Sequence, residues 1–221
     1  MRADVTLEWG GETLTLLHER ALWWAGGKTL FIADPHFGKA ATFRFSGIPV
    51  PDTSHEDDLE RLSHILTMTA APRLVILGDF LHAKAGRNEE MFQALTAWRE
   101  RHAEIEIVLV EGNHDRHAGA PPEELRITCV KGPWRLGAFH CRHEPQEDAE
   151  AQVLAGHLHP AFRLSDRMGT SLRAPCFHFS PRVCILPAFG SFTGTHCMSS
   201  TEKDRVFLVG PGSVMEVPSR G

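Results

Sequence analysis

The fold is decided by residues 105–115, Ile105-Glu106-Ile107-Val108-Leu109-Val110-Glu111-Gly112-Asn113-His114-Asp115, where a strand pattern runs directly into polar residues. The apolar and β-branched residues from Ile105 to Val110 predict a buried strand. Gly112 then permits a sharp turn, after which Asn113 and His114 leave the carboxyl end of the strand. Because ligands bind at that edge of open α/β sheets, the stretch also predicts where the functional site lies.

Three further apolar runs end in the same way. They are Leu30-Phe31-Ile32-Ala33 before Asp34-Pro35-His36, Leu74-Val75-Ile76-Leu77 before Gly78-Asp79, and Val153-Leu154-Ala155 before Gly156-His157-Leu158-His159. One such histidine or aspartate is most often a turn former or a helix cap, but four strands that deliver them to one edge indicate a shared site. Asp34 and His36 are two residues apart and are expected to point to the same side, as are His157 and His159 if that segment is extended.

The residue types at these strand ends favour a divalent metal ion. Carboxylate, imidazole and amide oxygen together suit hard or borderline ions such as Mn²⁺, Fe²⁺ or Zn²⁺, and no cysteine stands among them. We therefore expect a centre with two divalent metal ions, for which Mn²⁺ fits the oxygen-rich ligand set best.

The order of these motifs resembles that of the calcineurin-like metallophosphoesterases. The matching motifs are Asp34-x-His36, Gly78-Asp79, Gly112-Asn113-His114-Asp115, a later histidine and Gly156-His157-x-His159. The flanks are similar to one branch, the ligase-associated DNA damage response endonucleases, in Asp34-Pro35-His36-Phe37-Gly38-Lys39-Ala40-Ala41, Phe43-Arg44, Gly47-Ile48-Pro49-Val50-Pro51 and Leu186-Pro187-Ala188-Phe189-Gly190. This resemblance covers nearly the whole chain. It implies an α/β fold, a four-layer α/β/β/α sandwich of two mixed sheets flanked by helices, in one domain over residues 1–221.

Carried over residue by residue, the resemblance implies two metal sites that share a bridging carboxylate. One metal would be held by Asp34, His36 and His159, the other by Asn113, His143 and His157, and Asp79 would bridge them. A carboxylate suits the bridging position because its two oxygens and full charge can serve two cations.

The later histidine has two candidates in the segment Phe139-His140-Cys141-Arg142-His143-Glu144-Pro145. His143 is favoured because it stands at the end of the predicted strand, in a His-x-Pro context that resembles the family pattern. His140 lies within the strand, where its side chain would face a packed side. We take His143 as the ligand and keep His140 as the alternative.

His114 and Asp115 are the candidate catalytic residues. The resemblance implies that His114 stands close to the metals without binding them, where it can donate a hydrogen bond to a phosphoryl oxygen or protonate the leaving alkoxide. Asp115 or a backbone carbonyl group could orient the His114 ring, and Asp115 could instead only cap the helix after the turn, so both roles of Asp115 stay open. The implied reaction is in-line attack of a metal-activated hydroxide on phosphorus, with no covalent enzyme intermediate.

Composition narrows the class of protein. Of the 221 residues, 42% are hydrophobic and 23% charged, which is typical of one globular domain with a full core. The sequence has no run of about 18 apolar residues, and its alternating first residues are unlike a signal peptide, so we expect a cytoplasmic protein with no membrane span. The five cysteines have no paired spacing and predict free thiols, with a Cys176-His178-Cys184 zinc site as a weaker alternative.

The remaining patterns predict helices early in the chain and strands late. Amphipathic helices are expected over 55–70 and 88–101, with Asn88 as N-cap of the second, and residues 37–45 form a short helix or a loop. Two prolines require 47–51 to be extended. Short antiparallel strands are expected within 5–17 and at 21–24, joined at Gly10-Gly11 and at His18-Glu19-Arg20. Further strands are expected at 127–130 and 134–140, and in the second half at 152–155, 161–164, 173–179, 183–187 and 206–209. The sheet order, and which sheet the N-terminal hairpin joins, stay open.

Substrate choice depends on the cations around the metals. Lys39 and Arg44 follow the Asp34-Pro35-His36 loop closely enough to contact phosphates beside the scissile one. Lys84, Arg87 and Arg116 are similarly placed, although each is more often a solvated surface charge. The net charge of −5 and pI near 6.3 give no general support for nucleic-acid binding, but two divalent ions would make the cleft locally positive.

Three classes of function remain. The resemblance favours a metal-dependent phosphodiesterase or endonuclease that acts on DNA, with single-stranded DNA preferred, in repair, and in association with a DNA ligase and a helicase. The alternative is a small-molecule phosphoesterase that acts on nucleotides or cyclic nucleotides. A non-catalytic binding subunit is the weakest hypothesis, because every expected ligand is present.

Overall fold

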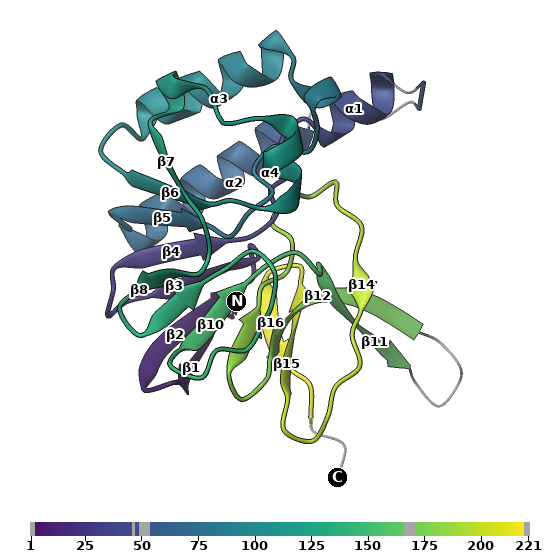
Figure 1. Ribbon diagram of the computed structural model, residues 1–221. Coiled ribbons are helices and arrows are strands. Elements are labelled where there is room, and N and C mark those ends of the chain that lie inside the picture. The colour runs from purple at the N-terminus through teal and green to yellow at the C-terminus, as the bar shows by residue number, and fades with distance from the viewer. Residues whose placement is uncertain (1–2, 46, 49–53, 166–170, 219–221) are drawn as a thin grey trace.

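The computed structural model describes residues 3–45, 47–48, 54–165 and 171–218, which form two β-sheets packed face to face (Figure 1). Helices lie over the outside of the first sheet. The expected sandwich of two mixed sheets flanked by helices is confirmed. The extended segment predicted at 47–51 falls mainly outside the described residues.

The first sheet has seven strands in the order β1-β2-β3-β4-β5-β6-β7. They are β1 (Val5–Trp9), β2 (Glu12–Leu17), β3 (Ala21–Trp24), β4 (Thr29–Ile32), β5 (Arg73–Ile76), β6 (Glu106–Val110) and β7 (Ile127–Val130). Strands β1 to β4 pair antiparallel, and β4 to β7 pair parallel. The N-terminal hairpin therefore extends the first sheet, and the parallel strands bring their carboxyl ends to one edge.

The helices follow the periodic apolar patterns. They are α1 (Lys39–Phe45), α2 (Ser54–Thr69), α3 (Glu89–Arg101) and α4 (Asn113–Ala118), with 3-10 turns η1 (Lys84–Gly86) and η2 (Glu123–Leu125). The apolar faces of α2 and α3, with Leu62 and Leu95, pack on the outer face of the first sheet. Asn88 caps α3 as predicted, since its side chain accepts a hydrogen bond from the Met91 amide at 2.8 Å. None of the helices in the described residues is long and apolar enough to span a membrane.

The second sheet has nine strands. They are β8 (Trp134–Leu136), β9 (Phe139–Cys141), β10 (Gln152–Ala155), β11 (Pro160–Ser165), β12 (Ser171–Phe179), β13 (Val183–Ile185), β14 (His196–Cys197), β15 (Arg205–Gly210) and β16 (Ser213–Glu216). All helices of the described chain precede β7. On the outer face of the second sheet, Val153 and Ile185 pack against Leu158 and Met198, which lie beside β11 and β14. The short strands β14 and β16 were not predicted.

The single strand expected over 134–140 is wrong, because these residues form a hairpin. Strands β8 and β9 pair antiparallel, with Trp134 opposite Cys141. Gly137 turns the chain between them with φ of 59°, a left-handed conformation that side chains rarely adopt. A Cβ at this position would also lie 2.6 Å from the Trp24 ring. The sequence does not indicate this turn, because apolar residues flank the glycine on both sides.

The two sheets share an apolar core. Phe31 and Val108 of the first sheet and Phe139 and Leu154 of the second belong to one buried cluster. Phe139 meets Trp24 edge to face, with ring centroids 5.0 Å apart. Burial of aromatic side chains between the sheets supplies much of the driving force for their packing.

A buried ion pair ties α2 to the segment after β13. The Arg61 guanidinium donates to Asp58 Oδ1 at 2.8 Å and to the carbonyl oxygen of Phe189, and the Ser191 amide donates to Asp58 Oδ2 at 2.9 Å. The Phe189 amide in turn donates to the Ala33 carbonyl oxygen at 2.7 Å, directly after β4. The ion pair therefore holds the second sheet against the end of β4, where the predicted ligands begin.

We expect Asp58→Ala to lower the free energy of unfolding by about 2 kcal/mol, because Arg61 and the Ser191 amide lose their acceptor while remaining largely buried. Urea denaturation followed by circular dichroism measures the change. Glu60→Ala, an exposed neighbour on α2, serves as the control and should change stability by less than about 0.5 kcal/mol. Equal stability of the two variants would contradict this role for Asp58.

Candidate metal centre

The loops after β4 and β5 run side by side beyond the sheet. The Asp34 amide donates to the Gly78 carbonyl oxygen at 3.2 Å, and the His36 amide donates to the Asp79 carbonyl oxygen at 3.0 Å. The His82 amide donates back to the Phe37 carbonyl oxygen at 3.1 Å. These bonds keep the two loops in register and place Asp34 and His36 beside Asp79.

Asp34, His36 and His159 form the first group of potential ligands. One ligand atom from each lies within 4.8 Å of the others. Nε2 of His159 is 3.2 Å from Nε2 of His36 and 3.7 Å from Oδ1 of Asp34. Asp34 is fully buried and His36 nearly so. These are the three residues that the sequence predicts for one metal.

Asp79, His143 and His157 form a second group at the same spacing. Nε2 of His143 lies 2.9 Å from Oδ1 of Asn113 and 3.0 Å from Nδ1 of His157. Asp79 faces both groups, because its Oδ1 is 3.4 Å from Nε2 of His143 and its Oδ2 is 3.8 Å from Nε2 of His36. That position is the one expected of a bridging carboxylate.

Backbone carbonyl groups select the tautomer of two of these histidines. Nδ1 of His143 lies 3.0 Å from the Leu77 carbonyl oxygen, and Nδ1 of His159 lies 3.1 Å from that of Gly194. A carbonyl oxygen can only accept, so each Nδ1 carries the proton. Each Nε2 then keeps the lone pair that a metal ion requires.

Five of the seven predicted ligands have a left-handed backbone. The φ values are 51° at Asp34, 49° at His36, 52° at Asp79, 72° at His157 and 47° at His159. We expected these side chains to share a side because residues two apart in an extended chain do so. The chain is not extended at these residues, so that reason is wrong. The side chains converge because the chain turns sharply where each strand ends, and such residues tend to occur at functional sites.

Two glycines allow the ligands to approach one another. A Cβ at Gly78 would lie 2.1 Å from Nδ1 of His143, and a Cβ at Gly112 would lie 2.2 Å from Oδ1 of Asp79. A ligand on another strand thus occupies the space that a side chain would need. The glycine before Asp79 and the one before Asn113 are required for the close approach of ligands.

The charges of the site fit metal ions. Oδ1 of Asp34 is buried and has no hydrogen-bond partner within the described residues. Burial raises the pKa of the Asp79 carboxyl, and the Asp34 charge adds to this effect. Burial, with the Lys39 charge, lowers the pKa of His36 far below its usual range and keeps the ring in the neutral form that binds metals. Two buried carboxylates beside the neutral His36 ring are an environment that divalent cations stabilise.

His114 stands next to these two groups, and with His36 and His82 it forms a third set of closely spaced potential ligand atoms. Its amide donates to Asp79 Oδ1 at 2.9 Å, and its Nδ1 donates to the His82 carbonyl oxygen at 2.7 Å. Its ring centroid lies 5.0 Å from that of His36. The proton on Nδ1 is therefore engaged, and Nε2 is the ring nitrogen available to a substrate.

His82 belongs to the site, although no sequence motif predicts it. Its ring stacks on His114 with centroids 4.9 Å apart, and its Nδ1 lies 3.4 Å from Nδ1 of His36. Burial, with the charges of Lys39 and His114, lowers the pKa of His82 to about 4, so its ring is neutral near pH 7. The sequence feature that could have identified His82 is its position three residues after Asp79, in the same loop.

Asp115 has a structural place, which corrects its prediction as a catalytic residue. Its Oδ2 accepts from the Gly112 amide at 2.9 Å, and its Oδ1 accepts from the Leu81 amide at 3.2 Å. The carboxylate thus caps the start of α4 and ties it to the loop after β5. The ring of His114 is oriented by the His82 carbonyl group instead.

The other candidates divide between the site and the scaffold. Lys39 and Arg44 line a narrow pocket beside His36. Burial lowers the pKa of Lys39, whereas the negative charges of Asp34 and Asp79 raise it. The Lys39 ammonium group therefore lies near these two ligands. Arg87 instead donates to the carbonyl oxygens of Ala118, at 3.1 Å, and Ala120, at 3.0 Å, after α4.

Two alternatives raised by the sequence lie apart from the centre. His140 pairs with Asp148 through a 2.7 Å contact and is in neither ligand group, which favours His143. All five cysteines are free, as expected, and no group of three closely spaced ligand atoms in the described residues includes a cysteine.

A family comparison and one solved structure agree with each other. The sequence profile of the calcineurin-like phosphoesterases matches residues 27–166. The structure of Pseudomonas putida nuclease MPE is 39% identical in sequence, with a TM-score of 0.84, and the match covers 97% of this chain and 100% of that one. Yfce, a phosphoesterase from E. coli, is 14% identical with a TM-score of 0.41, over 87% of this chain and 99% of that one. No curated protein matches the sequence.

We expect the wild-type chain to bind two equivalents of Mn²⁺ and Asp79→Ala to lose at least one, because both ligand groups depend on that carboxylate. Elemental analysis after removal of unbound metal measures the content. Asp148→Ala, which removes a carboxylate outside both groups, is the control and should retain both equivalents. Full metal content in Asp79→Ala would contradict the bridging position.

Proposed function

Because the chain belongs to the calcineurin-like phosphoesterases, a family of metal-dependent hydrolases, we propose that it is an endonuclease that hydrolyses phosphodiester bonds in DNA, preferring single strands. The observation that carries the proposal is the match over 97% of this chain to the Pseudomonas putida nuclease. The predicted ligands converge at the seam of the two sheets, where a substrate phosphate can reach them. By the resemblance of its motifs we assign it to DNA repair, in association with a ligase and a helicase, and its free cysteines suit the cytoplasm.

The residues that would hold the metals are those of the two ligand groups, with Asn113 added to the second. When bound, two divalent ions, for which we propose Mn²⁺, supply Lewis-acid stabilisation of the phosphoryl charge and acidify a water molecule. The protein supplies four imidazoles, of which His143 and His159 have Nε2 oriented by a carbonyl partner on Nδ1, together with two carboxylates and an amide oxygen. Burial of Asp34 and His36 keeps the ligand side chains in place before the substrate arrives.

His114 is the proposed catalytic residue that does not bind metal. Its Nδ1 donates its proton to the His82 carbonyl oxygen, which fixes the orientation of the ring and leaves Nε2 available to the substrate. When the ring is protonated, Nε2 can donate a hydrogen bond to a phosphoryl oxygen or pass its proton to the leaving alkoxide. His82, stacked on the ring, restricts its movement.

Lys39 and Arg44 support DNA as the substrate. They lie beside His36 at a pocket of only about 20 Å³, so the backbone phosphate next to the scissile one would contact them at the mouth of this pocket and not inside it. Such a phosphate exists in a polynucleotide but not in a simple diester. The net charge of −5 favours the second candidate, a small-molecule phosphoesterase, because the surface as a whole repels nucleic acid.

We expect His114→Ala to lower kcat by about 100-fold or more while two metal equivalents remain, because the variant loses an acid or a hydrogen-bond donor to the phosphoryl oxygen, and no ligand. Steady-state kinetics on bis-p-nitrophenyl phosphate and elemental analysis measure the two quantities. His102→Ala, at the far end of α3, is the control. Loss of one metal equivalent in His114→Ala would make this histidine a ligand.

We expect the double variant Lys39→Ala, Arg44→Ala to lose far more activity on single-stranded DNA than on bis-p-nitrophenyl phosphate, and the DNA reaction to be the more salt-sensitive, because counterion release scales with the phosphates bound. The side-by-side assay, with duplex DNA added, also tests the preference for single strands.

The control for this experiment removes the same charge elsewhere, through Arg101→Ala with Lys203→Ala, both exposed. Lys39→Ala alone repeats the test if the double variant unfolds at lower temperature. Equal losses on both substrates would favour the small-molecule phosphoesterase.

A further inference from the structure

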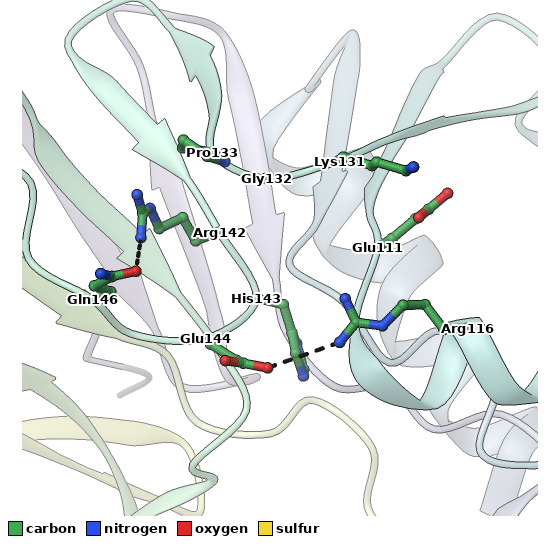
Figure 2. A pocket seen from close by; sticks show the side chains of 9 residues that line it. All are labelled: Glu111, Arg116, Lys131, Gly132, Pro133, Arg142, His143, Glu144 and Gln146. Atoms are coloured by element: carbon green, nitrogen blue, oxygen red, sulfur yellow. Dashed lines mark hydrogen bonds and ion pairs between the residues drawn. The ribbon is translucent and has the colours of Figure 1, made fainter.

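A second cavity, of about 460 Å³, opens beside His143, at the opposite ligand group from the Lys39 pocket. Three segments contribute its walls: the end of β6 with α4, the turn between β7 and β8, and the residues after β9. Figure 2 shows His143 between Arg116 of α4 and Glu144. The volume lies within the range of small-ligand sites, and one wall is a predicted metal ligand. The cavity therefore adjoins the place where a scissile phosphate would lie.

The three cations that line this cavity differ in how firmly they are held. Arg142 is mainly buried, donates to Gln146 Oε1 at 2.6 Å and lies 3.8 Å from Asp148 Oδ2. Its guanidinium points away from His143 in Figure 2. Lys131 is exposed on the turn after β7 and also points away from His143 in that view. Of the three, only Arg116 extends toward His143 in Figure 2.

The ion pair of Arg116 with Glu144 is weak. Nη2 of Arg116 lies 3.9 Å from Oε1 of Glu144, and the two side chains are 60% and 64% exposed. Exposed pairs at such a distance contribute little to stability, so Arg116 loses little when it leaves Glu144. A guanidinium can bind a phosphate through two parallel hydrogen bonds, which are stronger than this contact.

We propose that the cavity receives the nucleotide next to the scissile phosphodiester, and that Arg116 binds the phosphate of this nucleotide in place of Glu144. The inference rests on the proposed function and deepens it, because it makes a polynucleotide strand the substrate class. The strand crosses the metal centre from the Lys39 pocket at His36 to the Arg116 cavity at His143. A single small diester fills neither end.

In this arrangement Glu144 opposes the binding of a phosphate, whereas Arg116 favours it. Its carboxylate holds Arg116 when the cavity is empty and repels an incoming phosphate. Removal of its charge should therefore strengthen binding of a strand, whereas removal of the Arg116 charge should weaken it. If the ion pair were purely structural, both changes would alter the binding of a strand in the same direction.

The test compares Arg116→Ala, Glu144→Gln and the control Arg101→Ala in the Mn²⁺-loaded full chain. Substrates are a single-stranded oligonucleotide and bis-p-nitrophenyl phosphate. Arg116→Ala should lower kcat/KM for the oligonucleotide relative to the small diester about tenfold, mainly through KM, as expected for a lost charge-assisted hydrogen bond. The salt dependence of log KM for the oligonucleotide should weaken by about 0.7, the value for one phosphate on a single strand. Glu144→Gln should lower KM for the oligonucleotide severalfold.

Equal changes on both substrates in Arg116→Ala, or a higher oligonucleotide KM in Glu144→Gln, would overturn the nucleotide cavity while DNA cleavage by the wild type still stood. A wild type that turns over the small diester but cleaves no DNA would overturn the proposed function and this inference with it. The two failures are thus distinguishable, because one is seen in the variants and the other in the wild type.

Discussion

The centre depends on a backbone constraint: the chain must turn into the left-handed region directly after three of its strands. Five predicted ligands have such φ values, which cost on the order of 1 kcal/mol or more each for residues with a Cβ. The surrounding structure maintains them. Hydrogen bonds hold the Asp34 and Asp79 loops together, and Gly78 and Gly112 leave room for the ligands of neighbouring strands. Without these turns the side chains would continue along the strands instead of meeting at one point.

The seam between the sheets unites the ligands. The first sheet supplies Asp34, His36, Asp79 and Asn113, whereas the second supplies His143, His157 and His159. Each ligand group draws on both sheets, so metal binding and sheet packing must favour the same arrangement. The Arg61–Asp58 pair and the bond from Phe189 to Ala33 fix that seam beside the centre. Stability and chemistry therefore depend on the same few contacts.

Orientation of side chains gives the centre its chemical character. Carbonyl groups hold the Nδ1 protons of His143, His159 and His114, so the Nε2 atoms point inward. Two rings can then bind metal, and the third can serve the substrate. Cationic pockets at His36 and at His143 extend the centre in two directions, although the chain as a whole is acidic. Local placement of charge, more than total charge, thus governs which phosphoesters can approach.

The sequence by itself determined the ligand types, their order at the strand ends, the cap of α3 and the family. These features are local, because a strand end, a glycine or a cap is set by a few neighbouring residues. Only the tertiary structure decided that the N-terminal hairpin joins the first sheet, that Gly137 divides a predicted strand, and that Asp115 caps α4. It also brought His82 against His114 and placed Arg116 beside His143. Such contacts depend on which strands pair and how the sheets pack, and that choice is made by many distant residues together.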